Sequence, residues 1–206
     1  MPKLGIIGIV NEQMKQDPWA TLAALAEMGY RGLEGGDFLL KGDAADNLRR
    51  FADLGFSIVT TGTSRDDLRD KADKVLARAQ ALHAPQVTVW WAPMDSRDAV
   101  LADADLLNAV GRRFADAGVR LCYHNHDHEF RRTFDGLYAL DLLVANTDPK
   151  AVHFEIDIGW VAVGGECPAR VLRRLAGRVP CARWSQPRGV GRGGGPWPFL
   201  YSLTVW

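Results

Sequence analysis

The sequence predicts an α/β protein with a parallel sheet, because short apolar runs alternate with amphipathic helical segments along residues 1–180. Six strand–helix units of about 30 residues each fit this region, which is the size of a minimal βαβ step. No Gly-x-Gly-x-x-Gly motif follows the first strand, which argues against an open dinucleotide-binding sheet. Polar or acidic residues stand at the carboxyl ends of several predicted strands. In a closed barrel the active site lies at this end of the strands. We therefore predict a TIM-type (β/α)8 barrel that is incomplete, with about six βα units followed by an irregular tail.

The predicted strands are short runs rich in apolar and β-branched residues. They are Lys3–Val10, Arg31–Phe38, Ser57–Thr63, Gln86–Trp91, Arg120–His126 and Ala151–Asp157. The predicted helices carry apolar residues at helical spacing and span 18–28, Ala44–Leu54, Asp66–Leu82, Ala99–Ala117, Gly136–Ala145 and Pro168–Leu175. The first helix opens with Asp17 as N-cap and Pro18 in its first turn, and it stops at Gly29. At the end of the fourth strand, Trp90 and Trp91 are expected in the core rather than on a sugar-stacking platform.

Bulk composition limits the function classes. The chain has 206 residues, and its 25 basic and 25 acidic residues give a formal net charge of zero, which argues against a nucleic-acid partner bound through a basic surface. Its three cysteines lack Cys-x-x-Cys spacing, so we expect a reduced, cytoplasmic protein. No signal-peptide pattern and no run of about 18 apolar residues occurs, so no membrane partner is expected.

The last 26 residues, 181–206, depart from the pattern of residues 1–180. They contain no Asp, Glu or Lys, but they hold five glycines, three prolines and three tryptophans. The run Gly189–Pro196 cannot form a helix and interrupts a strand, whereas Phe199–Trp206 has the composition of a strand. We predict a partial barrel over 1–180 and an irregular tail over 181–206. A reading-frame change in a high-GC gene would explain such a tail and the loss of strands seven and eight; a genuine Gly-rich linker is the alternative.

The segment Tyr123–Glu129 (Tyr-His-Asn-His-Asp-His-Glu) holds three of the five histidines in the chain. On a strand, His124 and His126 point to the same face, and His128 joins them only if the strand continues. Imidazoles beside Glu129 offer nitrogen and carboxylate ligands to one divalent metal. Isolated histidines on strands are often structural, so the prediction rests on the cluster as a whole.

A second candidate site lies in Ala151–Trp160. Glu155 and Asp157 alternate to one face among apolar neighbours, where two carboxylates are costly unless a cation pairs with them. A metal bound by Asp157 would supply that cation, and a salt bridge to an arginine or lysine across the barrel is the alternative. Trp160 shapes the pocket floor or packs in the core. Glu34, which ends the second strand, lines the pocket or caps the next helix.

The motifs Tyr123–Phe130 and Phe154–Trp160 together resemble the sugar phosphate isomerase/epimerase superfamily, the xylose isomerase-like barrels, with a likeness that covers residues 3–180. This resemblance implies an eight-stranded barrel that binds a divalent metal at the ends of strands five to eight. Asp157 matches the aspartate of strand six, and His124 stands where many members have glutamate. Members also supply a histidine from strand seven after a Gly-Arg-Val-Pro-like lead, and a glutamate from strand eight. The chain has the lead, Gly177–Pro180, but neither of these ligands.

The resemblance implies metal-assisted proton transfer next to the carbonyl of a small sugar, a sugar phosphate or an inositol-derived ketone, with Mn²⁺, Mg²⁺, Co²⁺ or Zn²⁺ as the metal. The predicted roles are metal binding by His124, Asp157 and Glu129, catalysis by Glu129 and Asp157, and substrate binding by His126, Glu34, Trp160 and Glu155. Without strands seven and eight, we expect weak metal binding and little turnover. The alternatives are a non-catalytic fragment that forms a homo-oligomer through open sheet edges, an inosose-dehydratase-type lyase and, least favoured, an apurinic-site endonuclease.

Overall fold

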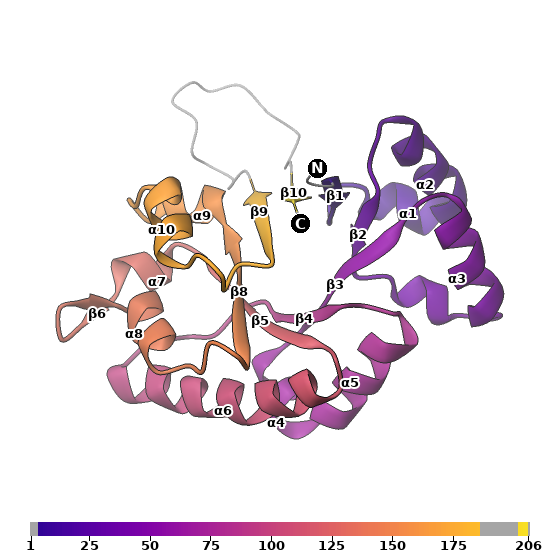
Figure 1. Ribbon diagram of the computed structural model, residues 1–206. Coiled ribbons are helices and arrows are strands. Elements are labelled where there is room, and N and C mark those ends of the chain that lie inside the picture. Colours follow the sequence, from indigo (N-terminus) through magenta and orange to yellow (C-terminus); the bar gives the residue numbers. More distant parts are fainter. Residues whose placement is uncertain (1–3, 186–201, 206) are drawn as a thin grey trace, which may run out of the picture.

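The computed structural model describes residues 4–185 and 202–205, and seven of its strands run parallel to one another in chain order (Figure 1). These strands are β1 (Leu4–Ile6), β2 (Gly32–Glu34), β3 (Ser57–Thr63), β4 (Gln86–Val89), β5 (Arg120–His124), β8 (Val152–Asp157) and β9 (Cys181–Ser185). The eighth position is taken by β10 (Ser202–Val205), which pairs antiparallel with both β9 and β1 and closes the ring. The predicted TIM-type barrel is therefore confirmed, and it is incomplete as a parallel barrel.

The expectation that the chain loses strand seven after residue 180 is wrong, because β9 forms a seventh parallel strand. Glu155 pairs with Cys181 and Asp157 pairs with Arg183, so β9 continues the parallel sheet beyond β8. The segment Cys181–Ser185 contains neither glycine nor proline, and each residue can complete the ladder that the edge of β8 offers. The Gly-rich run Gly189–Pro196 lies outside the described residues.

The helices cover the outside of the strands (Figure 1). They are α1 (Asn11–Gln16), α2 (Pro18–Glu27), the 3₁₀ helix η1 (Asp37–Leu40), α3 (Ala44–Asp53), α4 (Arg65–Asp70), α5 (Ala72–Ala81), α6 (Arg97–Asp116), α7 (His128–Arg131), α8 (Ala139–Ala145), α9 (Ile158–Val163) and α10 (Pro168–Arg174). A small hairpin, β6 (Thr133–Phe134) and β7 (Leu137–Tyr138), connects α7 to α8. Within residues 4–185 and 202–205, no helix combines the length and apolar character that crossing a bilayer requires.

Local sequence signals set several element boundaries. The carboxylate of Asp17 accepts hydrogen bonds from the backbone N–H groups of Trp19 and Ala20, both at 3.0 Å, so the predicted N-cap of α2 is confirmed. The second strand ends at Glu34, earlier than predicted, because Gly35 and Gly36 both adopt φ above +100°. The single helix predicted over Asp66–Leu82 is wrong. It breaks at Lys71, whose ψ of 29° leaves the helical range and for which the sequence carries no glycine or proline signal.

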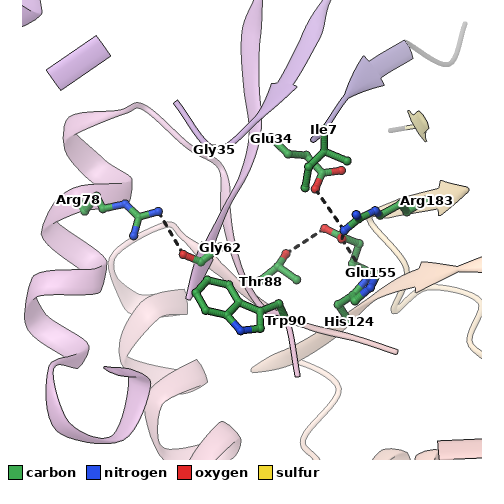
Figure 2. A pocket seen from close by; sticks show the side chains of 10 residues that line it. All are labelled: Ile7, Glu34, Gly35, Gly62, Arg78, Thr88, Trp90, His124, Glu155 and Arg183. Carbon is green, nitrogen blue, oxygen red and sulfur yellow. Dashed lines mark hydrogen bonds and ion pairs between the residues drawn. The ribbon is translucent and has the colours of Figure 1, made fainter. Parts of the chain in front are cut away.

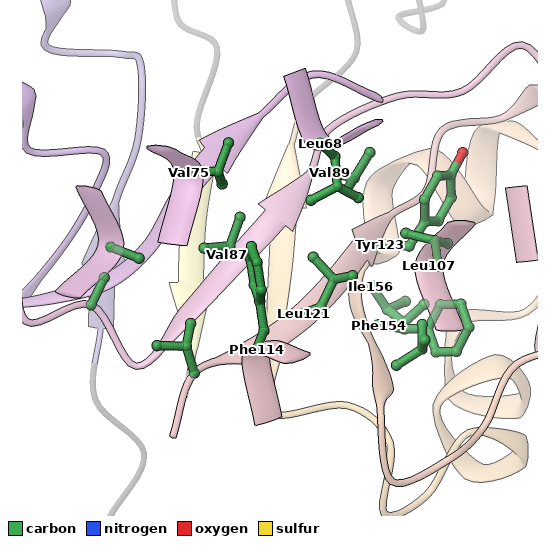
Figure 3. Close-up of a cluster of buried hydrophobic side chains, with 14 of the residues drawn as sticks. Leu68, Val75, Val87, Val89, Leu107, Phe114, Leu121, Tyr123, Phe154 and Ile156 are labelled. Carbon is green, nitrogen blue, oxygen red and sulfur yellow. The ribbon is translucent and has the colours of Figure 1, made fainter. Parts of the chain in front are cut away.

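The apolar core lies between the outer face of the strands and the helices. Val87, Leu121 and Phe154 project from β4, β5 and β8, and each has no exposed side-chain surface (Figure 3). Phe114 of α6 packs over them, and it is equally buried. Burying a side chain of this size contributes about 1.5–3 kcal/mol to folding. This layer anchors the strands and thus fixes where their carboxyl ends lie.

The inward face of the strands is more polar than the outward face. The hydroxyl groups of Thr60 and Thr88 lie 2.7 Å apart, and Thr88 donates a 3.0 Å hydrogen bond to the Glu155 carboxylate. The amide of Gln86 contacts the sulfur of Cys181 at 2.9 Å, so that β9 joins this inner layer. Because successive strand residues alternate between faces, the same registers that bury the apolar core also direct these polar groups inward.

Candidate functional site

A cavity of about 240 Å³ lies at the carboxyl ends of the barrel strands. Its lining residues are Ile7, Glu34, Gly35, Gly62, Arg78, Thr88, Trp90, His124, Glu155 and Arg183 (Figure 2). Small-molecule pockets typically measure roughly 300–1,000 Å³, so this cavity suits a molecule below drug size. Three residues predicted from the sequence, Glu34, His124 and Glu155, meet at this one cavity.

An arginine that the sequence analysis did not select lies at the centre of the acidic residues. The guanidinium of Arg183, on β9, is 4.0 Å from Glu34 Oε2, 3.8 Å from Glu155 Oε1 and 3.8 Å from Asp157 Oδ2. The three carboxylate side chains are almost fully buried, with exposed fractions of 4%, 1% and 0%. The sequence analysis weighed a metal against a salt bridge to an arginine or lysine across the barrel, and the structure places beside both carboxylates an arginine from the adjacent strand β9.

His124 and Glu155 form a buried pair on the neighbouring strands β5 and β8. His124 Nδ1 lies 3.3 Å from Glu155 Oε1, and Thr88 donates to the other oxygen of this carboxylate. Burial acts to raise the pKa of Glu155, but the contacts with His124, Arg183 and Thr88 outweigh burial and leave the pKa below its ordinary value. Glu155 is therefore held as a carboxylate at the cavity wall.

The pKa of Glu34 is shifted in the opposite direction from that of Glu155. Burial raises its pKa well above the ordinary value, and repulsion from Glu155 and Asp157 acts in the same direction, while Arg183 opposes both. Glu34 ends β2, and β2 lies opposite β8 in the ring of eight strands. The cavity thus places two carboxyl groups of different proton affinity on facing walls.

Asp157 organises the backbone at the end of β8. Its Oδ1 accepts hydrogen bonds from the backbone N–H groups of Gly159 at 2.9 Å, Trp160 at 3.2 Å and Ser185 at 3.2 Å. Asn125 accepts from the Asp157 N–H at 2.9 Å and donates to its carbonyl at 3.3 Å. One carboxylate oxygen of Asp157 is therefore committed to capping α9 and tying down β9. The other, Oδ2, has no hydrogen-bond partner among the residues that the structure describes, and it lies 3.8 Å from Arg183.

His126, predicted to bind substrate, follows β5 in the loop and not in the strand. Its ring lies 4.9 Å from that of His124 and 5.3 Å from that of Trp160, between centroids, so these three predicted residues are neighbours. Burial, and then the nearby His124, His128 and Arg183, lower the pKa of His126 to about 4. The imidazole is therefore neutral near pH 7, although His126 and Trp160 do not line the cavity itself.

Glu129, predicted as a metal ligand and catalytic group, lies apart from the cavity lining. Its Oε1 accepts a 2.7 Å hydrogen bond from the hydroxyl of Tyr123, and its Oε2 accepts one of 2.9 Å from the backbone N–H of His126. The side chain is fully buried, and this burial raises its pKa. In this arrangement Glu129 holds the loop that carries His126.

The expectation that Trp90 and Trp91 both belong to the core is wrong, because both side chains are about half exposed. Their exposed fractions are 49% and 47%, because β4 ends at Val89 and both rings lie beyond the strand. Trp90 lines the cavity and packs over Gly62, where an added Cβ would come within 3.0 Å of the indole ring. A half-exposed indole at a cavity rim offers an apolar face on which a sugar ring can stack.

The donor groups do not fit a resident divalent metal as they are arranged. Among residues 4–185 and 202–205, no three His, Cys, Asp or Glu side chains converge on a common ion position. Arg183 lies between the carboxylates, and one Asp157 oxygen is committed to three backbone N–H groups. The divalent metal predicted from the sequence therefore lacks a formed ligand set in this part of the chain.

Comparisons with known proteins define the class of fold. A sugar phosphate isomerase/epimerase from Parabacteroides distasonis is 23% identical, with a TM-score of 0.72 over 86% of this chain and 73% of that one. The IolI protein with a bound zinc atom is 10% identical, with a TM-score of 0.63 over 82% of this chain and 66% of that one. The chain has the fold of the xylose isomerase-like barrels to which sugar phosphate isomerases/epimerases belong.

A sequence comparison adds a local relative within that class. A stretch of 76 residues, 37% of this chain, is 34% identical to an inosose dehydratase from Clostridium beijerinckii. The match spans only 24% of that enzyme's length. No family model matches the chain.

Proposed function

We propose that the cavity binds a small polyhydroxylated ketone, such as a ketose, its phosphate ester or an inosose, and that the chain acts by slow proton transfer next to the carbonyl. The observation that carries this proposal is the meeting of Glu34, His124 and Glu155 around one cavity at the carboxyl ends of the strands. The xylose isomerase-like fold and the local likeness to an inosose dehydratase support the substrate class.

The residues at the cavity suit each part of such a reaction. Glu155, on one wall, is a carboxylate able to accept a proton from the carbon beside the carbonyl. Glu34, on the facing wall, is the second carboxyl group and can return a proton from the opposite side of the substrate. The guanidinium of Arg183 lies between them and stabilises the negative charge that develops on the carbonyl oxygen. Trp90 supplies the stacking face for the sugar ring.

The predicted roles of the remaining residues stay part of this proposal in modified form. His126 and Trp160 position the loop beside His124, and Asp157 holds Arg183 and the start of α9. The prediction that the chain holds a divalent metal weakly and turns over little also stays part of the proposal.

Proton exchange measured by NMR tests the proposal. In D₂O, the chain is expected to exchange the hydrogen beside the carbonyl of a ketose or an inosose faster than the protein-free solution does. Glu155→Gln removes the base, and we expect the exchange rate to fall by about 10²-fold or more. The control Asp73→Asn alters an exposed carboxylate that pairs with Arg113, away from the cavity lining, and leaves the rate unchanged. No exchange by the wild-type chain, or equal rates for wild type and Glu155→Gln, would contradict the proposal.

A dehydratase is the second candidate, favoured by the 34% identity to inosose dehydratase. Elimination of water begins with the same removal of the proton beside the carbonyl, and Glu34 would then protonate the departing hydroxyl group. The same NMR experiment separates the two candidates, because loss of water from an inosose leaves an enol that tautomerises to a 1,2-diketone, with new vinyl or methylene resonances. Exchange without these resonances favours the isomerase-type reaction.

A further inference from the structure

We infer that Arg183 is the resident cation of the acidic cluster formed by Glu34, Glu155 and Asp157, and that its guanidinium occupies the position where a divalent metal would otherwise bind. The inference concerns ion binding alone and does not depend on the proposed sugar chemistry. It assigns to β9 a role that goes beyond closing the barrel.

The position of Arg183 in the ring supports this inference. Arg183 extends from β9, which is next to β8, but its guanidinium also reaches Glu34 on β2, the strand opposite β8. Figure 2 shows the side chain extending between the two walls of the cavity, with Glu155 and Glu34 on either side of the guanidinium. A single side chain thus bridges the width of the barrel mouth.

The guanidinium of Arg183 lies at similar distances from the three carboxylates of the cluster. Its nitrogen–oxygen separations from Glu34, Glu155 and Asp157 lie between 3.8 and 4.0 Å. A divalent metal needs much shorter bonds, of about 2.0–2.2 Å to oxygen, and among the described residues no three ligand side chains converge on such a position. The carboxylates would therefore have to move inward to bind a metal, and Arg183 occupies the space between them.

The buried carboxylates of the acidic cluster need at least one positively charged partner. Carboxylates with exposed fractions of 4% or less are costly without a positive partner, and an arginine side chain does not lose its proton inside a protein. Arg183 supplies a permanent positive charge that offsets one of the carboxylate charges, and its guanidinium occupies the space between the carboxylates that an incoming divalent ion would need. Removing the guanidinium leaves the carboxylates without this partner, and a divalent ion then becomes the favoured replacement.

Two donor atoms in and beside the cluster form ion pairs but no hydrogen bonds among the described residues. Asp157 Oδ2 and His124 Nδ1 are buried and have no hydrogen-bond partner within the described structure, and the latter lies 3.3 Å from Glu155. The substitution Arg183→His would add an imidazole from β9. The resulting set of imidazole and carboxylate donors is of the kind that Zn²⁺ and Co²⁺ bind in proteins.

Ion titration of three purified chains tests the inference. We compare the wild type with Arg183→His, which removes the guanidinium and adds a ligand, and with Arg183→Met, which removes the charge and keeps similar length. Calorimetry with Zn²⁺ and visible absorption with Co²⁺ give the affinity and the coordination. We expect Arg183→His to bind one ion per chain at least 100-fold more tightly than the wild type, and Arg183→Met to lie between them.

The matched control is Arg78→His, because Arg78 lines the same cavity but pairs with Asp37 at 2.8 Å and not with the three carboxylates. Its affinity is expected to equal that of the wild type. Sub-micromolar binding of one ion by the wild-type chain would overturn the inference, as would equal affinities of the wild type and both Arg183 variants. If a variant fails to fold alone, recovery of cooperative unfolding on adding Zn²⁺ supports the inference, and no recovery overturns it.

Discussion

Gly159→Ala tests whether the seventh strand packs against the site as described. Gly159 is the second residue of α9, and a Cβ added there would lie 1.9 Å from the carbonyl oxygen of Ser185 and 3.0 Å from its carbonyl carbon. Ordinary contacts begin near 3.4 Å, so this carbonyl group is about 1.5 Å too close. Backbone atoms cannot move aside as a flexible side chain does, so the end of β9 must separate from α9.

Three contributions determine how much Gly159→Ala changes the free energy of unfolding. Overpacking of this kind costs about 1–3 kcal/mol. The displacement also breaks the 3.2 Å hydrogen bond from the Ser185 N–H to Asp157, and losing a bond to a charged group costs about 1.5–3 kcal/mol. Replacing glycine by alanine inside a helix returns up to about 1 kcal/mol. The net expectation is a loss of about 1.5–5 kcal/mol in the free energy of unfolding.

Urea unfolding followed by far-UV circular dichroism measures this loss. The control is Gly165→Ala, a glycine in the same region with φ of +91° and no atom within 4 Å of an added Cβ. Backbone strain alone should cost about 1–2 kcal/mol there. Equal stability of Gly159→Ala and the wild type, or a loss no larger than in the control, would refute the packing of β9 against α9.

Three further predictions concern the core and buried polar pairs, each checked by urea unfolding. Phe154→Ala removes a fully buried ring and should lower the free energy of unfolding by about 3–5 kcal/mol; a loss below 1 kcal/mol would contradict its burial. Tyr123→Phe leaves an oxygen of Glu129 without its donor and should cost about 1–3 kcal/mol, whereas no change would show that the 2.7 Å bond is not formed. Burial raises the pKa of Asp103, which Arg65 only partly offsets. The wild type should therefore gain stability relative to Asp103→Asn as the pH falls through this raised pKa, and the opposite trend would contradict the assignment.

The strand ends could be predicted from the sequence because polar residues follow apolar runs there. Glu34, His124 and Glu155 each stand at or near the end of a predicted strand, and in a parallel barrel all such ends meet at one mouth. The alternation of Glu155 with apolar neighbours also indicated that a buried cation must be present, and left the choice between a metal and an arginine open. The structure contains the arginine.

Arg183 itself was missed because it lies in the stretch whose composition differs from the rest of the chain. One signal for it was present: Cys181, Arg183 and Ser185 alternate in a segment free of glycine and proline, directly after the Gly-Arg-Val-Pro lead. The position of Glu129 could not be predicted, because the turn after His124 directs its side chain to the Tyr123 hydroxyl. Such a contact depends on loop geometry, which residue patterns do not encode.

Anomalous diffraction from crystals of the wild-type chain soaked in Mn²⁺ tests the central claim most directly. The account predicts density for the Arg183 guanidinium between Glu34, Glu155 and Asp157, and no anomalous peak among these carboxylates. A strong peak coordinated by Asp157 and His124, with Arg183 turned away, would contradict it.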